Sequence, residues 1–192
     1  MKQIFSMDVE RDIDSAVEFS KYLNKKGWQG EFYICGHLVE KYPEKVKQIA
    51  KYHILGGHGY YHEDFARLNH LKIRALINKT MEIFKNNGLK IRGWRFPGLS
   101  YSNYAMNYVA TKGLYDSSIR DKVWNKWGNL FFIRNWGRNL LRGIVTVPYL
   151  FSNKLVEKPW SFADLNYPNF ICKNGRLMTH CYNYKQFEKY LK

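Results

Sequence analysis

Two histidines four residues apart, His58 and His62, are the side chains whose type and spacing most readily suggest chemistry. In a helical turn this spacing places both imidazoles on one face, close enough to share a divalent ion. Gly56, Gly57 and Gly59 surround the pair and indicate a bent backbone rather than an ordinary helix interior. The segment is not the H-E-x-x-H motif of zinc proteases, because no glutamate stands at position 59. His-x-x-x-His is common by chance, so a metal site needs a further ligand.

Two carboxylates near the N-terminus, Asp8 and Glu10, supply candidates for that ligand. If the chain is extended here, residues two apart point to the same side of a strand. Alone, they would be interpreted as two solvated acids at a strand end. Together with the histidines, Glu10 can be an oxygen ligand and Asp8 a general base. Two histidines and one carboxylate leave a coordination position for water, which is typical of a catalytic site.

Short apolar runs alternate with longer segments of helical periodicity along most of the chain. The predicted strands are residues 4–9, 32–35, 54–55, 90–95, 114–117, 144–147 and 177–181, and the predicted helices are residues 12–26, 38–52, 68–86, 103–111 and 184–191. Asp12 is the expected N-cap of the first helix, and Gly27 its stop signal. This alternation predicts a parallel α/β sheet or barrel.

The candidate residues fall at the ends of these strands. Asp8 and Glu10 end the first strand, His58 follows the third, Arg95 ends the next, and His180 ends the last. In parallel α/β folds, functional groups gather at the carboxyl ends of the strands. We therefore expect these groups to converge on one rim.

Several short motifs in a fixed order carry a family resemblance. They are Ser6-Met7-Asp8-Val9-Glu10, His58-x-x-x-His62, Arg95-Phe96-Pro97, Tyr115-Asp116-Ser117-Ser118 and Met178-Thr179-His180. In order and spacing they resemble the motifs of polysaccharide deacetylases, the NodB-homology family of carbohydrate esterases. The resemblance runs from residue 6 to residue 182 and includes Val145-Thr146-Val147-Pro148 as a penultimate strand. It implies a distorted (β/α) barrel of about seven strands and one deacetylase-like domain over residues 1–192.

The resemblance also implies a reaction, the metal-dependent hydrolysis of N-acetyl groups on a sugar or polysaccharide. The implied roles are Asp8 as base, Arg95 as the cation that holds Asp8 ionised, His180 as the acid that protonates the departing amine, and Glu10, His58 and His62 as ligands of a divalent ion. The ion would polarise the acetyl carbonyl and stabilise the oxyanion. Zinc fits this ligand set best, and the softness of the ligands is also compatible with cobalt or iron.

Two positions depart from the family pattern. Family members usually have aspartate where this chain has Glu10, which is one methylene longer. Many members also pair the acid histidine with an aspartate that follows the fifth strand. Asp121 is the nearest candidate for that partner and Asp164 is the other, whereas Asp116 is interpreted as a structural residue at a strand end.

A basic and aromatic stretch covers residues 120–142. Its candidate substrate-binding residues are Trp124, Trp127, Arg134, Trp136 and Arg138. One interpretation is a connection whose aromatic rings pack on the barrel while its charges stay in water. The other is a substrate wall, in which rings stack on sugars and cations meet an anionic or lipid-linked glycan. The net charge of +15 and the pI near 9.7 are compatible with either.

Length and composition narrow the classes of protein to which this chain can belong. The chain has 192 residues, which is the size of one domain, and its three cysteines form no C-x-x-C pair, so a disulfide scaffold is not expected. No apolar run is long enough for a membrane span, and no signal peptide is evident, so we expect a cytoplasmic protein or one peripheral to a membrane surface.

Two alternative functions stay open: an amidase for another small C–N substrate, and an inactive binding protein for an anionic glycan or nucleic acid. No nucleic-acid motif supports the latter.

Overall fold

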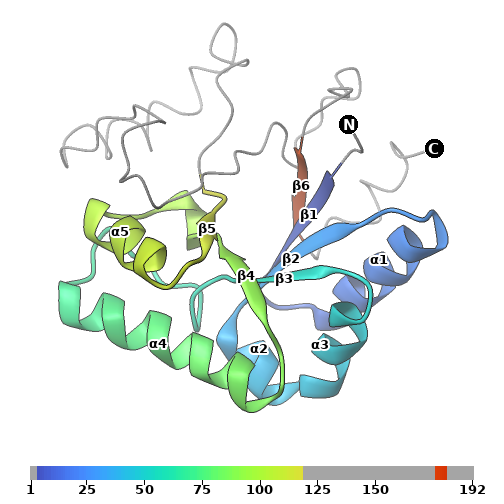
Figure 1. Cartoon of the computed structure of the whole chain (residues 1–192), viewed down its shortest axis with the longest axis horizontal. Helices are drawn as coiled ribbons and strands as arrows, with labels where there is room; N and C mark the ends of the chain where they lie inside the picture. The colour runs from blue at the N-terminus through green and yellow to red at the C-terminus, as the bar shows by residue number, and fades with distance from the viewer. Residues whose placement is uncertain (1–3, 119–175, 181–192) are drawn as a thin grey trace, which may run out of the picture.

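The structure is a computed structural model that describes residues 4–118 and 176–180 (Figure 1). The elements in chain order are β1 (Ile4–Val9), α1 (Ile13–Lys25), β2 (Gly30–Ile34), α2 (Gly36–Lys41), α3 (Pro43–Ala50), β3 (Ile54–Gly57), α4 (His70–Asn86), β4 (Ile91–Trp94), the short 3-10 helix η1 (Pro97–Leu99), α5 (Asn103–Thr111), β5 (Tyr115–Asp116) and β6 (Arg176–His180). The strand predicted at 144–147 and the helix predicted at 184–191 lie outside the described residues.

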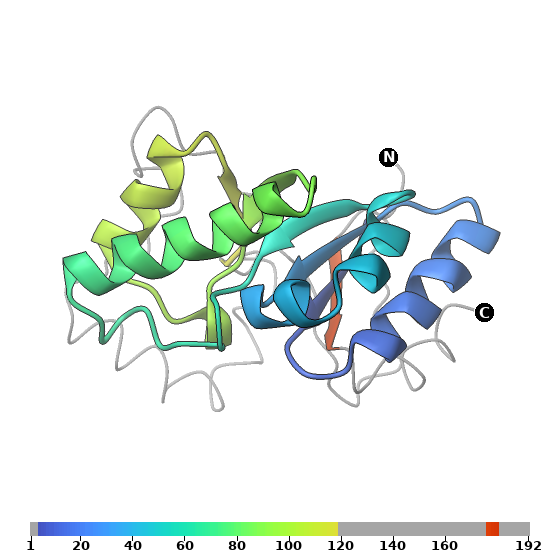
Figure 2. The same cartoon turned by 90° about the horizontal axis from the view of Figure 1, so that it is seen from below.

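The described strands form one sheet in the order β5-β4-β3-β2-β1-β6, and every pairing is parallel. Helices α1 to α4 lie along one side of this curved sheet, below it in Figure 1 and in front of it in Figure 2. Because all strands run in the same direction, their carboxyl ends lie along one edge. The alternating β and α segments of the sequence thus produce the predicted parallel α/β architecture.

Local sequence explains where the helices begin and end. The Asp12 side chain accepts a hydrogen bond from the backbone N–H of Ser15 (3.0 Å), which confirms it as the N-cap of α1. The single helix predicted at 38–52 is wrong, because the structure has two helices there, α2 and α3. Pro43 begins the second helix, and Tyr42 before it has left the helical region (φ −132°, ψ 51°). A residue that precedes proline is sterically driven out of the α conformation.

The two faces of β1 and β2 have different chemistry. Phe5, Met7 and Val9 of β1, with Phe32 and Ile34 of β2, belong to the core beneath helices α1 to α3. The alternate residues face the other way, because successive side chains of a strand point to opposite faces. Four buried polar residues therefore share the second face: Ser6, Asp8, Glu31 and Tyr33.

A second apolar cluster packs around β4, α4 and α5, with Trp94 and Phe96 fully buried in it. It anchors the end of β4, the segment that leads into Arg95.

Within the described part of the chain, no helix has both the length and the apolar character needed to cross a bilayer.

Candidate active site

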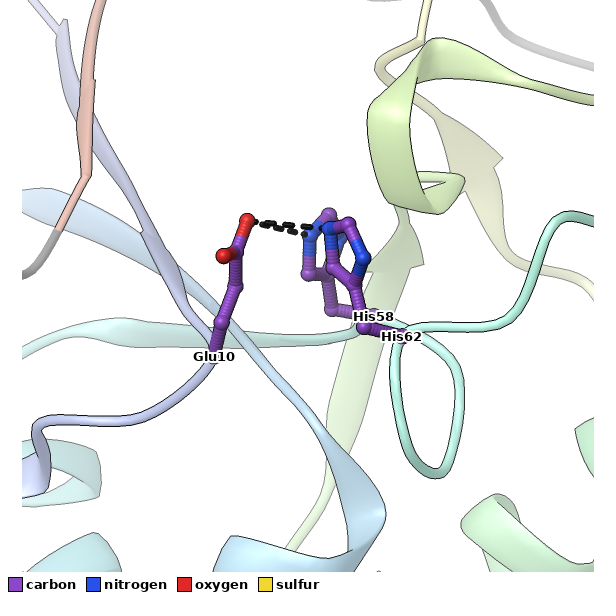
Figure 3. Close-up of side chains that lie close together, drawn as sticks. All are labelled: Glu10, His58 and His62. Atoms are coloured by element: carbon purple, nitrogen blue, oxygen red, sulfur yellow. Dashed lines mark ion pairs between the residues drawn. The ribbon is translucent and has the colours of Figure 1, made fainter.

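Three side chains with metal-ligating atoms meet at the carboxyl edge of the sheet: Glu10, His58 and His62 (Figure 3). The Nε2 atom of His62 lies 3.0 Å from Oε1 of Glu10, and Nε2 of His58 lies 3.7 Å from the same oxygen. One ligand atom from each residue lies within 4.8 Å of the others. The structure therefore brings together the three residues that the sequence predicted as a ligand set.

The two histidines lie on a bent backbone, as the flanking glycines indicated, and not on a helical turn. They lie in the loop after β3, where Gly59 and His62 both have left-handed backbone angles (φ 73° and 74°). Glu63 holds this loop, because its carboxylate accepts hydrogen bonds from the backbone N–H groups of Tyr60 and Tyr61, each at 2.9 Å. A Cβ atom on Gly59 would lie 2.7 Å from that carboxylate. The glycine is therefore needed for conformation and for space.

His58 is oriented by the end of β4. Its Nδ1 lies 2.8 Å from the backbone oxygen of Arg95. Since a carbonyl oxygen only accepts, Nδ1 is the donor and Nε2 is the nitrogen that faces the site. The residue is 1% exposed, and its Nε2 has no hydrogen-bond partner among the described residues. A buried nitrogen without a partner is costly, and metal ligation would satisfy it. The residues therefore fit a divalent ion.

The charge state of Glu10 also suits a ligand. Burial alone would raise the pKa of its carboxyl group, but the nearby imidazoles of His58 and His62 outweigh burial and lower the pKa far below its usual value. The carboxylate is thus ionised at neutral pH, as metal binding requires.

Asp8 lies beside this set and is held by Arg95. Nη1 of Arg95 donates to Oδ1 of Asp8 at 2.6 Å, and Oδ2 of Asp8 lies 3.9 Å from Nε2 of His58. Burial alone would lower the pKa of the Arg95 guanidinium, yet the net shift is upward, chiefly because of the charge of Asp8. The guanidinium is therefore a permanent cation against one oxygen of Asp8, while the other oxygen faces the metal ligands.

Sequence reasoning missed two residues that complete this arrangement, Ser6 and Ser117. Nη2 of Arg95 donates to the hydroxyl oxygens of Ser6 (3.1 Å) and Ser117 (2.9 Å), and Nε donates to the backbone oxygen of Ser117 (2.8 Å). Ser6 could have been found, since it shares a strand face with Asp8. Ser117 required the sheet order, which brings the end of β5 next to the end of β4.

Asp116 has the structural role that was predicted. It accepts hydrogen bonds from the backbone N–H and the hydroxyl group of Ser118, and the Ser118 hydroxyl oxygen in turn accepts from the backbone N–H of Phe96. These bonds tie the residues after β5 to those after β4.

His180 ends β6, and its backbone is in register with Asp8 of β1. The predicted acid residue is therefore placed on the same edge of the sheet as the predicted base. The remaining predicted site residues lie outside the described part of the chain, namely Asp121, Asp164, Trp124, Trp127, Arg134, Trp136 and Arg138.

Comparison with protein families gives a match to the model described as Polysaccharide deacetylase, over residues 12–116. This range is more than half of the chain. It includes His58, His62 and Arg95, whereas Asp8 and Glu10 lie just before it and His180 lies after it.

Among curated proteins, the peptidoglycan deacetylase of Helicobacter pylori is 27% identical over 172 residues, which are 81% of this chain and 55% of that protein. The chain thus spans about half the length of this relative. Among solved structures, a CE4 family pseudoenzyme from Bacillus anthracis has a TM-score of 0.65 at 13% identity, covering 99% of this chain and 59% of that chain. A family 4 carbohydrate esterase from the same organism has a TM-score of 0.63 at 19% identity, covering 98% and 73%. These likenesses, with the all-parallel α/β sheet, confirm the predicted distorted (β/α) barrel fold.

Proposed function

The chain belongs to the polysaccharide deacetylase family, and from that premise we propose that it hydrolyses N-acetyl groups on a glycan with a divalent ion held by Glu10, His58 and His62. The reaction breaks the amide C–N bond with one water molecule and yields acetate and a free amine on the sugar. The name of the Helicobacter pylori relative favours peptidoglycan as the class of substrate.

The observation that carries the proposal is the buried Nε2 atom of His58. The imidazole ring of His58 is oriented by the hydrogen bond from its Nδ1 to the backbone oxygen of Arg95. Its Nε2 lies within 4 Å of carboxylate oxygens of Glu10 and Asp8 without a hydrogen bond to either. A purely structural histidine in this place would be expected to donate or accept with both nitrogens. The set of two imidazoles and one carboxylate matches zinc in donor chemistry. When bound, such an ion supplies Lewis-acid activation of a water molecule and of the acetyl carbonyl.

The chain's own residues supply the proton transfers. Asp8 is proposed as the base: Arg95 binds its Oδ1, and its Oδ2 lies 3.9 Å from Nε2 of His58 in the ligand set, where it can accept a proton from the attacking water. His180 is proposed as the acid that donates a proton to the departing amine. Its support is the motif around it and the register that places its backbone next to Asp8.

The acid histidine needs a group to orient it, and Asp121 or Asp164 remains the proposed partner from the sequence. The stretch 120–142 remains the proposed contact for an anionic glycan. A position in the cytoplasm or at a membrane surface also stays a prediction.

A catalytically inactive binding protein is the second candidate, because one of the structural neighbours is itself named a pseudoenzyme. The two candidates differ in what they release. Purified protein reconstituted with zinc is incubated with peptidoglycan fragments and with N-acetylglucosamine oligomers, and acetate is measured. We expect stoichiometric metal and metal-dependent acetate release. Glycan binding without acetate release, in protein that has bound the metal, would favour the second candidate.

A further inference from the structure

The ring of Tyr33 lies against the guanidinium group of Arg95, with Cζ of Arg95 4.1 Å from the ring centroid. Tyr33 belongs to β2 and is fully buried. Its hydroxyl group donates to Oε2 of Glu31 at 2.7 Å, and Glu31 is itself only 2% exposed. Neither residue belongs to the motifs that carry the family resemblance.

The strand register explains how these residues meet. Tyr33 is paired with Asp8 and Glu31 is paired with Ser6, so all four side chains share one face of β1 and β2. Arg95 reaches this face from the end of β4 and donates to both Ser6 and Asp8. The Tyr33 and Glu31 pair therefore lies beside the arginine that holds the proposed base.

A glycine in the intervening strand makes room for the ring. Gly56 of β3 is the register partner of Tyr33, and a Cβ atom at Gly56 would lie 2.6 Å from Cε1 of that ring. Any other residue at position 56 would push the ring away from its place. The ring can thus lie over β3 and reach Arg95.

The contacts of Arg95 divide into two kinds. Ser6, Asp8 and Ser117 accept hydrogen bonds from the N–H groups of the guanidinium, whereas the ring of Tyr33 lies under its Cζ atom. Cation–π attraction is strongest where water is excluded, as it is here. Donation of the phenol proton toward Glu31 increases the electron density of the ring and so strengthens this attraction. The ring thereby opposes a tilt of the guanidinium that the hydrogen bonds alone allow.

We propose that Tyr33, held by Glu31, is a positioning residue that sets the tilt of the Arg95 guanidinium and thereby aims Asp8 at the site formed by Glu10, His58 and His62. The expected effect on turnover rests on the proposed function, whereas the expected effect on the orientation of the Arg95 guanidinium does not. A misplacement of about 1 Å in a reacting group can cost roughly a hundredfold in rate. The effect should therefore appear in kcat rather than in KM or metal content.

The test uses three variants of the full-length, zinc-loaded protein: Tyr33→Leu, which removes the ring, Tyr33→Phe, which keeps the ring and removes the hydroxyl group, and Glu31→Gln, which keeps an acceptor and removes the charge. Phe32→Leu is the matched control, because Phe32 is equally buried but lies on the opposite face of β2 in the helix-covered core. We expect Tyr33→Leu to lower kcat by roughly tenfold or more with KM and zinc content unchanged. Tyr33→Phe should recover most of the loss, and Glu31→Gln should fall between the wild type and Tyr33→Leu.

A second measurement does not depend on activity. Rotation of the Arg95 guanidinium about its Nε–Cζ bond is measured by ¹⁵N NMR of the arginine side chains. We expect this rotation to be slow in the wild type and in Phe32→Leu, and faster in Tyr33→Leu. If the wild type releases no acetate, the proposed function fails, and the NMR result alone decides whether Tyr33 positions Arg95.

Three results would each overturn the proposal. The first is unchanged Arg95 rotation in Tyr33→Leu, or in Glu31→Gln if the leucine variant does not fold. The second is an equal loss of kcat in Phe32→Leu, and the third is a loss of zinc in Tyr33→Leu, because either would indicate general destabilisation rather than positioning.

Discussion

Nδ1 of His58 lies 2.8 Å from the backbone oxygen of Arg95, so one strand end orients a metal-site imidazole and also supplies the cation that binds Asp8. The two contacts come from one residue, through its main chain and its side chain. A shift in the end of β4 would therefore disturb the proposed metal site and the proposed base together.

The first prediction concerns the metal ligands. His58→Ala or His62→Ala removes one of three donors, so each variant should lose most bound zinc while remaining folded. Metal content is measured by elemental analysis after zinc loading and buffer exchange, with folding checked by circular dichroism. His70→Ala is the control, because His70 lies at the start of α4 and outside the ligand set. Wild-type protein without stoichiometric metal under these conditions would contradict the site.

The second prediction separates the roles of the two carboxylates. Asp8→Asn should keep zinc and lower kcat by roughly 10²- to 10⁴-fold, which is the usual cost of removing a general base. Glu10→Ala should instead weaken zinc affinity, and Glu10→Asp should retain part of it. Titration with zinc and steady-state kinetics measure the two effects. Loss of zinc in Asp8→Asn with retention in Glu10→Ala would reverse the assignment.

The third prediction tests the loop between the histidines. Gly59→Ala places a methyl group 2.7 Å from the Glu63 carboxylate, so the loop must move and zinc affinity should fall. Gly88→Ala is a matched control, because Gly88 has the same left-handed backbone (φ 71°) with no atom within 4 Å of an added Cβ. Both variants should lose about 1 kcal/mol of stability from backbone strain. Only Gly59→Ala should lose zinc affinity, and an equal affinity in the two variants would refute the role of this loop.

The fourth prediction concerns pH and a histidine distant from the site. His53 is buried, its Nε2 donates to the backbone oxygen of Ser20 (2.9 Å), and its Nδ1 accepts from the backbone N–H of Gly30 (3.2 Å). Burial lowers the pKa of His53 below its usual value of 6.5, although the hydrogen bond to Ser20 opposes this shift. The unfolded chain then binds more protons than the folded protein as pH falls below 6.5, so the folded state loses stability there.

His53→Gln removes this titration while it keeps a donor and an acceptor. The free energy of unfolding, measured by urea titration between pH 7.5 and pH 5, should therefore fall less steeply in His53→Gln than in the wild type. The other histidines are common to both proteins, so their contributions to the pH dependence of the free energy of unfolding cancel in the comparison. Equal slopes would show that His53 does not carry this pH dependence.

The fifth prediction concerns residues 120–142, which lie outside the described residues. If this stretch binds an anionic glycan or a membrane surface, reversal of Arg134, Arg138 and Arg142 to glutamate should raise KM for charged substrates or abolish vesicle binding. Hydrolysis of a small neutral acetylated substrate should change little. Added salt should weaken the wild-type effect, because exposed charges are screened over roughly 8–10 Å at physiological ionic strength. Identical kinetics on every charged substrate, without vesicle binding by either protein, would favour a packing role.

The sequence by itself determined the alternation of strands and helices, the N-cap of α1 at Asp12, the bounds 103–111 of α5, and the donors Asp8, Glu10, His58, His62 and Arg95. These follow from local rules: periodicity, capping, and the meeting of parallel strand ends at one edge of a sheet. The prediction of one helix over residues 38–52 was wrong because it did not apply a further local rule, by which Pro43 drives Tyr42 out of the helical conformation.

Only the tertiary structure decided which atoms meet. The contact between Arg95 and Asp8 joins residues 87 positions apart, and that between His58 and Arg95 joins residues 37 apart. The contact of the Tyr33 ring with Arg95 depends on Gly56 in the strand between them. Sequence spacing gives the face of a strand on which a side chain lies. The order and register of the strands decide which other side chain it meets there, because they place segments distant in the chain side by side.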